Sequence, residues 1–98
     1  MISERAYKMI DVIKTMDEKD KLRLAICLAD SSMSSISYDK KEMLKIADTR
    51  LREIDEEYRT TYVNMRKYGS VLLTTAMITE LPLEEQNKVT MFLINSIK

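Results

Sequence analysis

Residues 39–68 read DKKEMLKIADTRLREIDEEYRTTYVNMRKY, and neither Gly nor Pro occurs among them. Asp39, followed three residues later by Glu42, is typical of the capping box that opens a helix. Gly69, directly after the stretch, is typical of the residue that follows the last turn of a helix. The stretch therefore predicts one unbroken helix over residues 39–68.

Apolar or aromatic side chains recur along this stretch at heptad spacing, as in a coiled coil, with one polar exception. The row consists of Leu44, Ala47, Leu51, Ile54, Tyr58, Thr61, Met65 and Tyr68. Such a helix would extend about 45 Å, whereas a compact chain of this size is roughly 30–35 Å across. We therefore expect either that other helices cover both of its halves or that the row contacts a second copy of the chain.

The N-terminal part predicts two consecutive helices. Ser3 is a plausible N-cap for an amphipathic helix over about 4–15, and Asp17 marks the start of a second helix. From Leu22 to Ala29 only Arg23 interrupts the apolar residues. We expect this second helix to be the most enclosed element of the fold, since a helix that is apolar on nearly every side must be covered.

The C-terminal part predicts a second pair of elements around Pro82. Pro82 suits the first position of a helix and is followed by Glu84 and Glu85, which favour a first turn. The preceding segment 71–79 is apolar but rich in β-branched residues, so that helix and strand both remain open for it. The serine-rich segment SSMSSIS, residues 31–37, is expected to be a loop.

Composition favours an all-α fold, because one Gly and one Pro in 98 residues leave few of the tight turns that β-rich folds need. We expect a single domain over residues 1–98, with helical hairpins at about 4–30 and 70–97 packed on a central helix at about 39–68. Hydrophobic residues make up 45% and charged residues 33%. With no leader peptide or membrane-spanning segment evident, these values favour a soluble, cytoplasmic protein.

The absence of several residue types excludes most enzymatic chemistry. The chain has no His, which removes the usual general base and the commonest metal ligand. Its single Cys, Cys27, cannot complete a zinc site or an internal disulfide, and one Gly cannot form a phosphate-binding loop. We expect no catalytic, cofactor-binding or metal-binding residues.

The heptad row instead suggests a protein–protein interaction module, a small regulator or inhibitor that acts by steric binding. Tyr and Met are enriched where protein surfaces meet, and both occur in the second half of the predicted long helix. The candidate interface residues are Leu44, Leu51, Ile54, Tyr58, Tyr62, Met65 and Tyr68. We expect the partner to be another protein. We also expect the chain to form a homodimer.

Two other functions remain open. Ala25-x-x-x-Ala29 followed by serines 34, 35 and 37 is similar to a helix-turn-helix, and Lys40, Lys41 and Lys45 could contact DNA phosphates. However, Asp30 stands where that motif has an apolar residue, and Lys plus Arg equal Asp plus Glu at 16 each, so no overall positive charge attracts nucleic acid. The other possibility is a structural subunit of a larger assembly.

Overall fold

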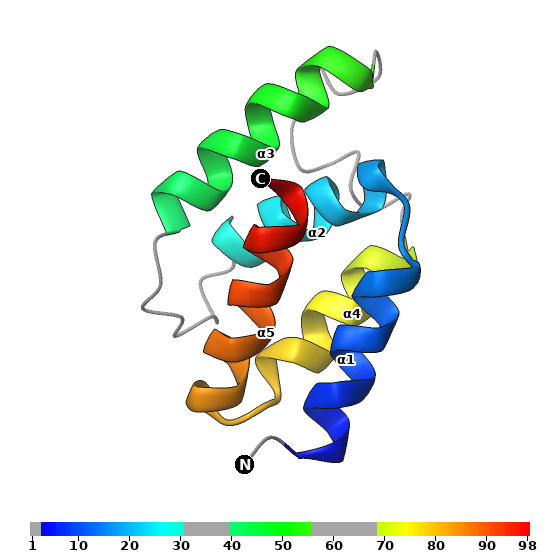
Figure 1. The fold of residues 1–98 in the computed structure, drawn as a ribbon, viewed down its shortest axis with the longest axis vertical. Coiled ribbons are helices and arrows are strands. Elements are labelled where there is room, and N and C mark those ends of the chain that lie inside the picture. The colour runs from blue at the N-terminus through cyan, green and yellow to red at the C-terminus, as the bar shows by residue number, and fades with distance from the viewer. Residues whose placement is uncertain (1–2, 31–39, 56–68) are drawn as a thin grey trace.

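The computed structural model describes residues 3–30, 40–55 and 69–98, and within these ranges the chain forms five α-helices and no strand. The helices are α1 (Glu4–Thr15), α2 (Glu18–Asp30), α3 (Lys40–Ile54), α4 (Gly69–Thr79) and α5 (Leu83–Ile97). They share one hydrophobic core (Figure 1). The predicted all-α class is confirmed, and α4 shows that segment 71–79 is helical.

The centre of the bundle is α2, which packs against α3, α4 and α5 (Figure 1). Its fully buried apolar side chains are Leu22, Leu24, Ala25, Ile26 and Leu28. Three other helices cover α2, as its apolar sequence predicts, but α5 contacts all four of the other described helices, so α2 is not singled out as the most enclosed.

Local hydrogen bonds define the starts of α1 and α2. The Ser3 hydroxyl accepts a hydrogen bond from the Ala6 backbone N–H at 3.3 Å. The Asp17 carboxylate accepts one from the Asp20 backbone N–H at 2.8 Å. Each side chain satisfies an N–H that has no partner within its own helix. Both helix starts lie where the sequence predicts them.

The turn between α4 and α5 is held by Gln86. Its side-chain amide donates to the backbone carbonyls of Thr79 at 3.0 Å and Leu81 at 2.6 Å. Pro82 lies one position before α5 rather than inside its first turn. The turn is therefore short and internally bonded, and it fixes the last turn of α4 relative to α5.

The predicted helix over 39–68 is wrong in its extent. In the described residues α3 ends at Ile54 and Asp55 lies outside it, while residues 56–68 lie outside the described ranges. The physical reason is the size of the support: α2, on which α3 packs, has 13 residues and is about 20 Å long.

An ion pair attaches the end of α3 to α2. Arg23 of α2 contacts the Asp55 carboxylate at 2.9 Å and the Asp20 carboxylate at 2.8 Å. The Arg23 and Asp55 side chains are each only 10% exposed. This contact joins residues far apart in the chain, and heptad spacing within residues 39–68 gives no sign of it.

Two further expectations about the packing need correction. The helices of each predicted hairpin do not pack mainly on each other: α1 packs against α5 and α4, and α2 packs against α3 (Figure 1). Gly69, expected to follow a helix, instead begins α4, and it does not have a positive φ. A Gly in the first turn of a helix needs no left-handed backbone, so its presence alone did not distinguish an end from a start.

Candidate interaction surface

The helix α4 is apolar on both its buried and its exposed sides. Val71, Thr74 and Ile78 face the core. On the other side Leu72 is 39% exposed, Leu73 62% and Met77 42%. No charged residue occurs in α4. A helix with apolar residues on all sides is normally covered on all sides. The exposed side of α4 is not covered by the described helices, and it lacks the charged residues expected of a solvated face.

The Thr side chains of α4 do not make its exposed side polar. Thr74 and Thr75 donate their hydroxyl hydrogens to the carbonyls of Ser70 at 2.7 Å and Val71 at 2.8 Å. These bonds within the helix satisfy the hydroxyl groups and let β-branched residues remain helical. The exposed side therefore presents mostly methyl, methylene and thioether groups.

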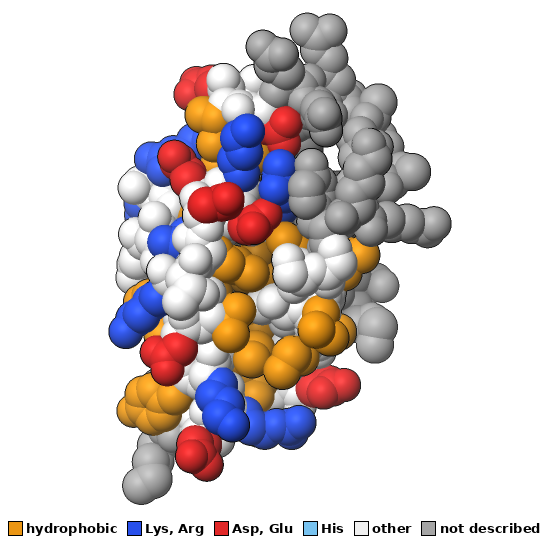
Figure 2. Space-filling model, turned by 90° about the vertical axis from the view of Figure 1, so that its right-hand side faces the viewer, with side chains coloured by type: hydrophobic (Ala, Val, Ile, Leu, Met, Phe, Trp, Pro, Cys, Tyr) orange, Lys and Arg blue, Asp and Glu red, His pale blue; other side chains and the backbone are white. Residues whose placement is uncertain are grey.

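The first helix continues this apolar area. In Figure 1, α1 and α4 lie side by side and run in opposite directions. Arg5, Lys8, Met9 and Val12 recur at spacings of three and four and so share one side of α1. Val12 is 37% exposed, whereas Met9 is 5% exposed. Figure 2 shows this side of the molecule, where apolar side chains gather above a group of cations.

We call this area the α1–α4 surface. Its residues are Arg5, Lys8, Met9, Val12, Leu72, Leu73, Ala76, Met77 and Leu81.

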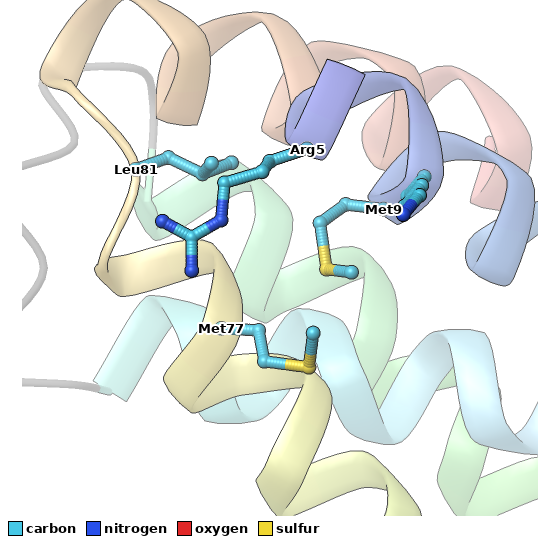
Figure 3. A pocket seen from close by; sticks show the side chains of 5 residues that line it. Arg5, Met9, Met77 and Leu81 are labelled. Atoms are coloured by element: carbon cyan, nitrogen blue, oxygen red, sulfur yellow. The ribbon is translucent and has the colours of Figure 1, made fainter. Parts of the chain in front are cut away.

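A hollow of about 160 Å³ lies at one end of the α1–α4 surface. It is lined by Arg5, Lys8, Met9, Met77 and Leu81. In Figure 3 the Arg5 guanidinium lies between Leu81 and Met77, and the thioethers of Met9 and Met77 face the same space. An apolar cavity of about 150 Å³ admits one benzene ring. The hollow therefore has room for one large apolar side chain.

The charge at the hollow is positive. Arg5 and Lys8 form no ion pair with any residue that the structure describes, and no acidic residue lines the hollow. Glu80, which precedes Leu81 in the chain, is exposed but does not line it. An apolar floor beside two free cations suits a ligand group that carries an apolar part next to an anion.

The structure places the predicted interface residues differently. Leu51 is fully buried and Leu44 packs against the core, so both serve the chain's own packing. Ile54 is 37% exposed. Tyr58, Tyr62, Met65 and Tyr68 lie outside the described residues. The described part of the heptad row thus leaves Ile54 as the one candidate with an exposed side chain.

The residues of the DNA-binding alternative lie on α2 and α3. Lys40 is the first residue of α3, and Lys41 and Lys45 are exposed one turn apart. Ala29, expected in the turn of a helix-turn-helix, lies inside α2. The motif's turn is therefore absent at Ala29, Lys41 and Lys45 are exposed cations, and serines 34, 35 and 37 lie outside the described residues.

Groups suited to other chemistry are not gathered in the described ranges. No three His, Cys, Asp or Glu side chains there are placed to hold a metal ion. None of the described helices is both long enough and apolar enough to cross a membrane.

The α1–α4 surface is not among the interface residues that the sequence predicts. A signal was present, since residues 69–79 contain no charged residue, but their apolar character was compatible with full burial. Comparison of the chain with protein-family models, curated proteins and solved structures finds no match.

Proposed function

We propose that this chain is a non-enzymatic interaction module, a small regulator that acts by steric binding of another protein through the α1–α4 surface. The observation that supports this most strongly is the exposure of Leu73, 62%, on a helix without a charged residue. A single exposed Leu is normal, but an apolar area that extends over two helices marks a binding site.

Covering the exposed apolar side chains of α4 supplies part of the free energy that binding needs. Fully burying a Leu or Met side chain contributes about 1.5–3 kcal/mol, so covering the partly exposed Leu72, Leu73 and Met77 contributes on the order of 2–4 kcal/mol. That is too little for stable association once lost freedom of motion is included. An apolar side chain placed in the hollow beside Met9 would add a further contribution of similar size.

This proposal moves the binding surface away from residues 39–68. Leu51 is fully buried in the core, so replacing it would disturb folding as well as binding. Leu73 and Met77 project from a helix whose other side already supplies the core contacts. The α1–α4 surface can therefore be occupied without unfolding any described element.

A photocrosslinking experiment in the native host tests the proposal. With Leu73→p-benzoylphenylalanine we expect irradiation to join the chain covalently to a different protein. The matched control is the same replacement at Met91, which is 42% exposed and belongs to α5. Equal adducts from both positions, or no adduct from position 73, would contradict the proposed site. Mass spectrometry of the adduct identifies the partner.

A further inference from the structure

Charge is present at only one end of the α1–α4 surface, and this restricts the kind of partner that can bind there. Its only charged residues, Arg5 and Lys8, lie at the hollow, beside the last turn of α4 and the first turns of α1. From there to Leu72 the exposed side of α4 carries no charge. A complementary partner is therefore apolar along its length and anionic at the end that covers the hollow.

The shape of the surface favours a helix as this partner. Leu73 and Met77 stand four residues apart on α4 and so share one side of the helix, and Leu81, only 5% exposed, follows in the turn after its last residue. On this surface α1 lies beside these residues (Figure 1), and an amphipathic helix with anchors at one-turn spacing can pack along the angle between two such helices. The described ranges contain no sheet edge to which an extended peptide could add. The 11 residues of α4 span about 16 Å, which corresponds to about three turns of a partner helix.

Charge also sets the direction of such a helix. Acidic side chains stabilise a helix at its N-terminal turn, where the macrodipole is positive. The anionic end of the partner lies over Arg5 and Lys8, which are next to the C-terminal end of α4. The partner helix therefore runs from the hollow toward Leu72, opposite in direction to α4.

Resting on the function proposed above, we infer that the α1–α4 surface binds a three-turn amphipathic helix whose acidic N-terminal turn contacts Arg5 and Lys8. The first apolar anchor of this helix enters the hollow between Met9 and Met77. The next anchors cover Met77 and Leu73.

An anionic membrane surface also combines apolar groups with negative charge, as the inferred partner helix does. Helices that bind membrane surfaces carry Lys and Arg along their polar face. Here the two cations stand at one end of the apolar area, and the 16 basic residues of the chain are balanced by 16 acidic residues. The arrangement therefore favours a helix with one acidic end over a uniformly anionic surface.

Three synthetic peptides test the inference with the full-length chain. Each has about 14 residues, a fluorescent label, blocked ends, and Leu at i, i+4 and i+7 on a background of Ala and Gln. The first has two Glu in its first turn, the second has two Lys there, and the third has the two Glu in its last turn. Fluorescence anisotropy at low salt measures the affinities. We expect the first peptide to bind about fivefold more tightly than either of the others.

Charge reversal assigns this preference to the two cations. In the variant Arg5→Glu with Lys8→Glu we expect the second peptide to bind more tightly than the first. Both residues are exposed in α1, and Glu suits the first turns of a helix, so the variant should fold. The matched control is Lys45→Glu with Arg50→Glu on α3, which lies away from this surface and should keep the original order.

Several results would overturn the inference. The three peptides could bind equally, binding could occur only to phosphatidylserine vesicles, or light scattering could show a dimer that Leu73→Glu dissociates. If position 73 crosslinks a partner but the peptides show no charge preference, the proposed function stands and the inferred partner chemistry fails. If there is neither crosslinking nor peptide binding, both fail.

Discussion

Glu85 shows how one carboxylate joins the first and the last helix of the chain. Its Oε1 accepts a hydrogen bond from the Ser3 backbone N–H at 2.6 Å, and the Glu85 residue is 9% exposed. Hydrogen bonds from the Ser3 side chain and backbone lower the pKa of Glu85 below its ordinary value of 4.5. Because Ser3 also caps α1, Glu85 connects the start of α1 to the first turn of α5.

This contact predicts a pH dependence of stability. A carboxyl group whose pKa is lower in the folded state stabilises the fold above its unfolded pKa, and this contribution is lost as the pH falls through the folded pKa. Glu85→Gln should therefore lower the unfolding temperature at pH 7, and the difference from the wild type should shrink on acidification below about pH 4.5. Thermal unfolding followed by circular dichroism measures this.

The control for that prediction is Glu84→Gln, because the Glu84 side chain is 79% exposed and contacts only Lys88, at 3.5 Å. The unfolding temperature of this variant should stay close to that of the wild type at each pH. A pH dependence that is the same for both variants would show that the Ser3 contact does not contribute.

At the level of elements, α4 combines a structural side with an exposed side. Ile78 is fully buried, whereas Leu73, five residues earlier, is 62% exposed. In α2, by contrast, the apolar residues Leu22, Leu24, Ala25, Ile26 and Leu28 are all fully buried. The contrast means that the apolar residues of α4 contribute to the fold on one side only.

Two matched substitutions test this division. Ile78→Ala should lower the free energy of unfolding by about 2–5 kcal/mol, because it leaves a cavity in the core. Leu73→Ala should change it by less than about 0.5 kcal/mol, because Leu73 has few core contacts to lose. Urea unfolding monitored at the helical circular dichroism band gives both values. A large loss for Leu73→Ala would show that the exposed side of α4 belongs to the core.

For the whole molecule, the contact of Arg23 with Asp20 and Asp55 links the start of α2 to the end of α3. Arg23→Met should lower the free energy of unfolding by about 3 kcal/mol, because it leaves a carboxylate buried without this partner. The matched control is Arg52→Met, which removes an exposed pair with Asp48 at 3.0 Å and should cost less than about 1 kcal/mol. Equal losses in urea unfolding would contradict the structural role of Arg23.

Self-association through the heptad row stays a prediction. Within the described residues the row contributes Leu44, Ala47 and Leu51 to the packing of α3 on the rest of the bundle. The same spacing that predicts a coiled coil thus serves one helix packing on another within the chain. Heptad periodicity shows that a side of the helix is apolar, but not which surface covers it.

The sequence by itself determined the helical class, four of the five helix regions and the caps of the first two helices. Scarce Gly and Pro, apolar spacing of three and four residues, and the positions of Ser3 and Asp17 act over a few residues, so they can be interpreted locally. The tertiary structure decided where α3 ends, which helix is central and which apolar residues remain exposed. Those features depend on contacts such as Arg23 with Asp55 and on how much of α4 the other helices cover. Leu73 and Ile78 are equally apolar, and their different roles arise because only one of them faces α2 and the core.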